Sequence, residues 1–293
     1  MPFISAEIAL QPAAWQQAAQ LLPGVAQMLP ADGERVAVVG CGTSWFMAES
    51  YARLREEARL GETDAFSASE FPAHRHYDRV VAITRSGTTT EILTLLARLR
   101  GVTPTVALTA DTATPVVEVT DLVIDLSFAN ERSVVQTLFA TTALTLLRAH
   151  LRHDIGHLIT EAESVLAAPL DSRWVEVEHV TFLGSGWAHG IAKGAALKMR
   201  EACQAWTESY PSTEYRHGPI SIAAPGRLVW QFGTGEPGLA EQVDHTGATY
   251  VHHQDDPQVD LLRIQLLAAA RATRLGLDPD HPRNLSRSVV LDG

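Results

Sequence analysis

The sequence predicts an α/β protein made of two related halves, each a parallel β-sheet sandwiched by helices. Two observations support this prediction. Short, continuously apolar runs alternate with segments of helical periodicity, as expected for strands buried between two helical layers. A strand run, a glycine turn and a helix also follow one another twice, at residues 35–60 and again from residue 179 onward.

The first half begins with a helical segment, residues 1–30, in which Pro12 stands at a position that favours helix starts. We interpret it as a packing helix. The first half proper, residues 31–160, has apolar strand runs at 35–39, 65–67, 79–84, 105–108 and 122–126. Helical patterns cover about 45–60, 89–100 and 134–152.

The second half, residues 170–293, follows a polar seam near residues 155–175. Strands are expected at 180–183, 228–232 and 248–252, with a long helix after the first strand and another over about 259–275. We predict an irregular polar segment after the long helix, which ends in His217-Gly218-Pro219, and an extended tail from Asp278. Trp187 and Trp206 are expected in the core or in an interface.

Composition excludes several functional classes. Apolar residues make up 46% and charged residues 19% of the 293 residues, which is typical of a soluble globular protein. The net charge of −11 argues against general nucleic-acid binding. No signal peptide, membrane span or cofactor is expected.

Cysteine and histidine usage points to no disulfide or metal chemistry. Two cysteines, Cys41 and Cys203, form neither a disulfide framework nor a zinc-binding spacing, which suits a cytoplasmic location. The pairs His252-His253 and Asp255-Asp256 look like a metal cluster. Neighbouring residues on a strand point in opposite directions, however, so we expect no shared ion.

Hydroxyl side chains gather where two strands should end and helices should begin. Residues 84–89 read Thr-Arg-Ser-Gly-Thr-Thr, and Thr43-Ser44 occupy the equivalent turn after the first strand. Backbone N–H groups at a helix start, together with such hydroxyls, can bind a phosphate monoester. Both turns fall at the carboxyl edge of a parallel sheet, where ligands of such folds bind. The alternative is that Ser86 or Thr88 only caps the helix.

The long helix of the second half carries Lys198 and Glu201 one turn apart on one face. Together with His217 they could move protons on a sugar. Each has a simpler interpretation. Glu201 could only form an ion pair with Lys198, Lys198 could hold substrate hydroxyls or only neutralise Glu201, and His217 could be a loop residue that hydrogen-bonds to backbone.

Taken together, these motifs resemble the sugar isomerase (SIS) family, in particular the isomerase portion of glucosamine-6-phosphate synthases. The resemblance covers nearly the whole chain. It lies in Gly40-Cys41-Gly42-Thr43-Ser44, the Ser86-Gly87-Thr88 loop, residues 131–137, Ala196–Glu201, His217-Gly218-Pro219 and residues 282–289. Glu7-Ile8 followed by Gln11-Pro12 also resembles the start of that portion.

The resemblance implies two flavodoxin-like SIS subdomains in a cytoplasmic homodimer that binds a small sugar phosphate. It implies that Glu201 is the base that moves a proton between C1 and C2 of the sugar. It also implies that His217 opens the sugar ring and reaches into the neighbouring subunit's site. Phosphosugar contacts are implied for Cys41, Gly42, Thr43, Ser44, Thr84, Arg85, Ser86, Gly87, Thr88, Thr89, Ser133, Val134 and Arg287.

Several departures from the family pattern bear on the reaction. No glutaminase domain is present in this sequence, so we expect no glutamine-fed amination. Arg287 stands where the family has a Schiff-base lysine, and a guanidinium group cannot form an imine. Gly194 replaces a glutamate. Arg85 replaces a glutamine. Its guanidinium group either binds the phosphate through two N–H groups or points to solvent.

Two hypotheses follow. The first is an enzyme that isomerises an aldose–ketose pair or releases an amine from an amino-sugar phosphate, as deaminases and deglycases do. Amine release fits better because such a substrate already carries its nitrogen. The second is a non-catalytic phosphosugar sensor, although residues 1–30 are too short and insufficiently basic for a DNA-binding helix-turn-helix.

Overall fold

The computed structural model describes residues 2–291, which form two compact units. The five-stranded unit contains residues 10–132, 138–159 and the tail from residue 286. The four-stranded unit contains the N-terminal residues up to Ala9, residues 133–137 and residues 160–285.

The sheet of the five-stranded unit is entirely parallel. Its strands are β1 (Val36–Gly40), β2 (Thr63–Ser67), β3 (Arg79–Ile83), β4 (Thr105–Thr109) and β5 (Leu122–Asp125), in the order β2-β1-β3-β4-β5. This is the flavodoxin-like strand order. The order reverses between β1 and β3, so their carboxyl ends lie next to each other at the position where such folds bind ligands.

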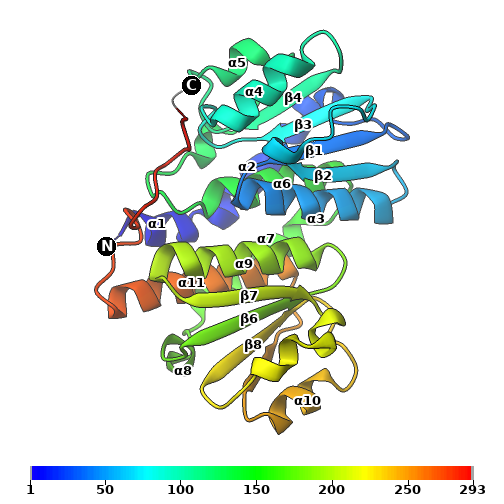
Figure 1. Ribbon diagram of the computed structural model, residues 1–293. Helices are drawn as coiled ribbons and strands as arrows, with labels where there is room; N and C mark the ends of the chain where they lie inside the picture. Colours follow the sequence, from blue (N-terminus) through cyan, green and yellow to red (C-terminus); the bar gives the residue numbers. More distant parts are fainter. Residues whose placement is uncertain (1, 292–293) are drawn as a thin grey trace. The chain divides into compact units, whose positions relative to one another are not determined.

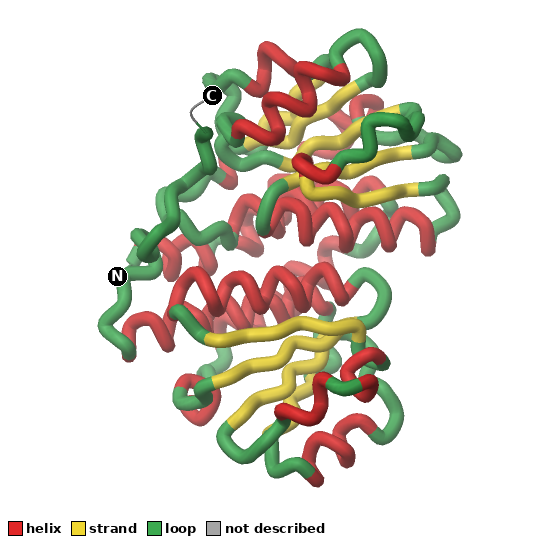
Figure 2. Tube along the Cα trace, in the orientation of Figure 1, coloured by secondary structure: helices red, strands yellow, loops and turns green. Residues whose placement is uncertain are grey.

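Helices cover both faces of this sheet (Figures 1 and 2). The helices are α2 (Gln11–Val25), α3 (Thr43–Glu57), α4 (Thr90–Leu99), α5 (Val116–Val119) and α6 (Leu138–His150), with short 3₁₀ turns η1 (Ala26–Met28), η2 (Ala68–Glu70) and η3 (Ser127–Ala129). One face packs Ala37, Val39 and Val80 against α4 and α5. The helices α2, α3 and α6 lie on the other face. Burial on both sides explains why the central strands β1 and β3 are almost continuously apolar.

The four-stranded unit repeats the arrangement with one strand fewer. Its strands are β6 (His179–Gly184), β7 (Trp206–Pro211), β8 (Arg227–Phe232) and β9 (Thr249–His252), parallel and in the order β7-β6-β8-β9. Its helices are α1 (Phe3–Ala9), α8 (Ser172–Val175), α9 (Ala188–Cys203), α10 (Leu239–His245) and α11 (Pro257–Arg274), with η4 (Glu214–His217) and η5 (Pro219–Ile222). Helix α7 (Ile155–Ala167) contains the boundary between the two units, which falls after Ile159.

Both faces of this second sheet are also covered. On one face α9 packs against α11 and against β6 and β7. On the other face Leu183 and Val229 pack against Tyr215 and against Leu239 of α10. The predicted fold class, two parallel sheets each sandwiched by helices, is therefore confirmed.

Local predictions differ from the structure in three places. The first part of the segment after α9 is not irregular but forms β7, an edge strand that is mostly half-buried and so accommodates polar residues. Trp206 is 79% exposed there, so it is not a core residue, and its alternative place in an interface stays a prediction. The helix predicted from Val134 begins only at Leu138, because Ser133 donates to the Glu7 carboxylate and Val134 N–H donates to Asp280 O instead.

No helix within residues 2–291 is both long and apolar enough to cross a bilayer.

Candidate functional site

The turn between β3 and α4 holds the predicted hydroxyl loop. Thr84 and Ser86 are buried, and the Ser86 hydroxyl accepts hydrogen bonds from Thr88 N–H at 3.3 Å and from the Thr88 hydroxyl at 3.0 Å. Thr89 precedes the helix but makes no side-chain capping bond. These hydroxyls therefore order the loop itself rather than cap α4, contrary to the simpler alternative.

Gly87 is required at the centre of this loop. Its φ of +62° lies in the left-handed region, and a Cβ atom here would overlap the Thr114 hydroxyl and lie 2.8 Å from Val116. Glycine is the residue that fits both conditions. The loop backbone is therefore held close to its neighbours in one conformation.

The turn between β1 and α3 brings a second pair of hydroxyls to the same sheet edge. Thr43 and Ser44 are buried in the first turn of α3, after Gly42 with φ +55°. At Gly40 a Cβ atom would lie 2.6 Å from the Ser44 backbone, so the turn is tight. Since β1 and β3 pair directly, the two turns are neighbours at the switch point of the sheet.

Cys41, in the same turn, keeps its proton. Burial raises the pKa of its thiol to about 11, and the nearby Glu91 carboxylate acts in the same direction. At neutral pH the group is a weak S–H donor rather than a thiolate, so it would not repel a bound anion.

The Arg85 side chain points into an internal network of polar contacts and not to solvent. Its side chain is buried, lies 3.7 Å from the Glu131 carboxylate and donates to the carbonyl of Arg287 at 2.8 Å. Of the two predicted orientations, the solvent-directed one is wrong. A contact with phosphate stays a prediction.

The tail of the five-stranded unit runs along the hydroxyl loop. Arg287 donates to the carbonyl of Glu131 and, at 2.5 Å, to the Asn130 side chain. The Ser288 and Thr88 hydroxyls lie 2.9 Å apart, and Thr90 N–H donates to Val289 O at 3.1 Å. Sequence reasoning missed Ser288, Val289 and Thr90, because no local pattern reports a contact across two hundred residues.

The acid–base pair lies on α9 of the four-stranded unit. Lys198 Nζ donates to Glu201 Oε2 at 2.5 Å. Lys198 is almost completely buried, whereas the Glu201 side chain is 20% exposed. The predicted i,i+3 ion pair is confirmed, and Lys198 neutralises Glu201. A contact of Lys198 with substrate stays a prediction.

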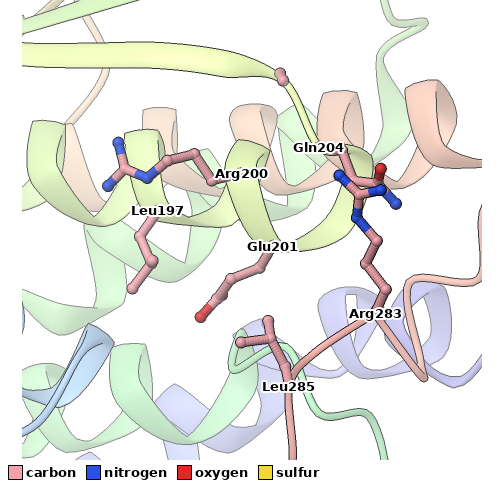
Figure 3. A pocket seen from close by; sticks show the side chains of 7 residues that line it. Leu197, Arg200, Glu201, Gln204, Arg283 and Leu285 are labelled. Carbon is pink, nitrogen blue, oxygen red and sulfur yellow. The ribbon is translucent and has the colours of Figure 1, made fainter.

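Glu201 also lines a cavity of about 350 Å³ (Figure 3). The other residues that line it are Leu197, Arg200, Gln204, Ala205, Arg283 and Leu285. The carboxylate is thus accessible to a small molecule while Lys198 fixes its position. A role of Glu201 as a general base stays a prediction.

The structure separates the remaining predicted residues from this cavity. His217 is an exposed residue at the end of η4, and within residues 2–291 its side chain makes no hydrogen bond and does not line the Glu201 cavity. Ser133 and Val134 belong to the four-stranded unit, where Glu7 and Asp280 hold them. They are not part of the hydroxyl-loop unit.

The histidine pair near α11 has separate partners. His252 Nε2 lies 2.7 Å from Gly233 O, and His253 Nδ1 lies 3.1 Å from the Asp260 carboxylate. Among the described residues, no group of three or more His, Cys, Asp or Glu side chains is arranged to hold a metal ion.

No family model matches the chain. The chain is 29% identical to a glutamine–fructose-6-phosphate aminotransferase [isomerizing] of Gloeobacter violaceus, an alignment that covers 92% of this chain and 54% of the relative. A Pyrobaculum aerophilum protein with the same name is 27% identical, with 95% and 56% covered. The chain thus spans about half the length of the curated relatives it matches.

Solved structures share its fold. Glucosamine-6-phosphate deaminase from Thermotoga maritima superposes with a TM-score of 0.82 at 22% identity, covering 98% of this chain and 99% of that one. Tagatose-6-phosphate ketose/aldose isomerase from Escherichia coli gives 0.80 at 18% identity, covering 96% and 97%. The comparisons confirm the α/β fold and agree with the resemblance to the sugar isomerase family.

Proposed function

We propose that this chain is a phosphosugar-processing enzyme that releases an amine from an amino-sugar 6-phosphate or isomerises an aldose–ketose pair. The observation that supports it most is Glu201, a carboxylate fixed by a buried lysine and open to a cavity. Proteins similar in sequence or fold are named for reactions of fructose 6-phosphate, glucosamine 6-phosphate and tagatose 6-phosphate.

The phosphate is assigned to the hydroxyl loops of the five-stranded unit. Buried hydroxyls and backbone N–H groups at two neighbouring helix starts offer neutral donors, which suits a chain of net charge −11. The protonated thiol of Cys41 adds a donor without adding negative charge. The assigned contacts are Cys41, Gly42, Thr43, Ser44, Thr84, Arg85, Ser86, Gly87, Thr88, Thr89 and Arg287, with Ser133 and Val134 added from the family resemblance.

The proton transfers are assigned to His217 and Glu201. His217 of a neighbouring subunit in a cytoplasmic homodimer would open the sugar ring, which suits its exposed position. Glu201 would then move a proton between C1 and C2 of the open chain. With an amino sugar this shift turns the carbon–nitrogen bond into an imine. Water adds to that carbon, the carbon–nitrogen bond breaks, and the nitrogen leaves as the amine.

Amine release is favoured over amination because of Arg287. A guanidinium group does not lose its proton at usable pH, so Arg287 cannot form an imine with the carbonyl of the sugar. Arg287 is instead held by Asn130 and by the carbonyl of Glu131. A substrate that already carries its nitrogen needs no such imine, which is why amine release fits Arg287 better.

A coupled assay for ammonia or amino-acid release tests this proposal. Glucosamine 6-phosphate and fructosamine 6-phosphates are offered to the wild type and to Glu201→Gln. Release by the wild type and its loss in the variant are expected. The proposal would be refuted if the wild type formed no product or if Glu201→Gln turned the substrate over as fast as the wild type.

The second candidate is a phosphosugar sensor without catalysis. The observation in its favour is that Lys198 already neutralises Glu201 while Arg287 replaces the family's lysine. A sensor should be stabilised against thermal unfolding by the sugar phosphate without converting it. Turnover of any of the sugar phosphates above would exclude this candidate.

A further inference from the structure

The walls of the cavity beside Glu201 carry more positive than negative charge. Three of the residues that line it are charged: Arg200, Glu201 and Arg283. Lys198 already balances Glu201 at 2.5 Å. Within residues 2–291 neither arginine makes an ion pair. The cavity is therefore complementary to an anionic group.

The two arginines differ in how firmly they are held. Arg200 donates to the carbonyl of Thr207 at 3.1 Å and to the Thr207 hydroxyl at 3.2 Å, so β7 anchors it. Arg283 is exposed, and no hydrogen bond of its side chain occurs within the described residues. Figure 3 shows its guanidinium and the Gln204 amide at the same end of the cavity. Within the described residues neither of these two side chains makes a hydrogen bond, so both can donate to a ligand at that end.

Local backbone geometry places both groups there. Gln204 follows the last residue of α9 with φ +55°, which ends the helix. Arg283 lies between the buried Pro282 and Asn284, whose φ is +62°. A cation near the end of α9 also stabilises the helix dipole. Lysine would serve that purpose equally well, whereas bidentate binding of a carboxylate needs the guanidinium fork.

We propose that Arg283 and Gln204 bind the carboxylate of an amino acid carried on the substrate's nitrogen. This inference rests on the proposed amine release and names its substrate class, a ketosamine 6-phosphate formed with an amino acid. Glu201 takes a proton from C1 while the C2 carbonyl oxygen is protonated, which gives an enaminol. A proton is then added to C2 and nitrogen loses its proton, so that C1 and nitrogen form an imine and C2 carries a hydroxyl. Water adds to C1, the C1–N bond breaks, and an aldose 6-phosphate and the amino acid leave.

Two matched substrates test the assignment: 6-phosphofructosyl-glycine and its glycinamide analogue, which has the same shape without the charge. The wild type should prefer the glycine compound by about tenfold or more in kcat/KM. Arg283→Gln should bring the ratio close to one, and Arg283→Lys should lose most of the preference while keeping the thermal stability. Arg98→Gln, which alters an exposed arginine on α4, should keep the wild-type ratio.

An unchanged ratio in Arg283→Gln, or no preference in the wild type, would overturn the carboxylate subsite while leaving amine release intact. If neither compound is turned over, the proposed reaction fails, and calorimetric titration decides the subsite separately. Tighter binding of the glycine compound that is lost in Arg283→Gln supports it, and equal dissociation constants overturn it. Inorganic phosphate is the third probe. Should Arg283→Gln weaken phosphate binding while Ser86→Ala does not, the anion at Arg283 is phosphate and the assignment is wrong.

Discussion

Lys198 and Glu201 form a short ion pair, 2.5 Å long, between a buried ammonium and a carboxylate that borders a cavity. Removing one partner leaves a buried charge without compensation. We expect Glu201→Ala to lower the free energy of unfolding by about 1–3 kcal/mol, a range that allows for the partial exposure of the acid. The double substitution Lys198→Met with Glu201→Leu should recover most of this loss in urea unfolding. Equal losses in the single and double variants would argue against the pair.

The buried pair of Arg85 and Glu131 should contribute strongly to folding stability. The two charges lie 3.7 Å apart and neither is exposed. Arg85→Gln should therefore cost about 3–5 kcal/mol. The exposed Arg98→Gln serves as control, with a change of no more than about 0.5 kcal/mol. Denaturation curves that cannot tell Arg85→Gln from Arg98→Gln would contradict this account.

Two glycines with similar backbone angles separate steric overlap from backbone strain. At Gly87 (φ +62°) a Cβ atom meets Thr114 and Val116, whereas at Gly101 (φ +73°) nothing lies within 4 Å. Gly101→Ala should cost about 1 kcal/mol for the left-handed conformation alone. Gly87→Ala should cost clearly more and should weaken the binding of a sugar phosphate. Thermal unfolding and ligand titration of both variants test this, and equal effects at the two positions would contradict it.

Acid should weaken the four-stranded unit through His189. Burial, and secondarily Lys193, lower the pKa of His189 to about 4 from its ordinary value of 6.5. Above pH 6.5 the ring is neutral in both states, so its contribution to stability is complete there. As the pH falls from 6.5 to 4 the unfolded chain takes up the proton first, and stability is lost. In His189→Asn the decrease in Tm over this range should be smaller, and an unchanged slope would speak against it.

Cys41 should react slowly with alkylating agents. A pKa of about 11, against an ordinary value of 9.0, means about a hundredfold less thiolate near neutral pH. The rate of iodoacetamide labelling of Cys41 in a Cys203→Ala variant should therefore fall well below that of free cysteine. Labelling as fast as free cysteine would show that the thiol is not buried as described.

The strands and the turns that follow them could be predicted because they are local. Val36–Val39 and Val80–Ile83 are apolar throughout, since helices cover both faces of the sheet. The turns after β1 and β6 could be predicted as well, because glycines directly follow both apolar runs in the sequence. Edge strand β7 was missed because Thr207, Glu208 and Ser209 break the apolar run. A strand with one free edge and an exposed side needs no such run.

The site was predictable where spacing along one helix defines it, as for Lys198 and Glu201. It was not predictable where the partner lies far away in the sequence. Glu131 and the carbonyl of Arg287 fix the direction of Arg85, and Ser288 reaches Thr88 from the tail. Nor could the sequence show that Arg283 lies beside Gln204, because residues 205–282 intervene.

The central claim, that Glu201 moves a proton on a bound sugar phosphate, is tested most directly by the rate of hydrogen–deuterium exchange at C1 and C2 of the sugar. The rate is measured by nuclear magnetic resonance in D₂O with the wild type and with Glu201→Gln, each saturated with the same amino-sugar 6-phosphate. The account predicts exchange in the wild type, a rate about 10²–10⁴-fold lower in Glu201→Gln, and similar dissociation constants for both. Equal exchange rates, or no exchange in a wild type shown to bind the sugar phosphate, would contradict it.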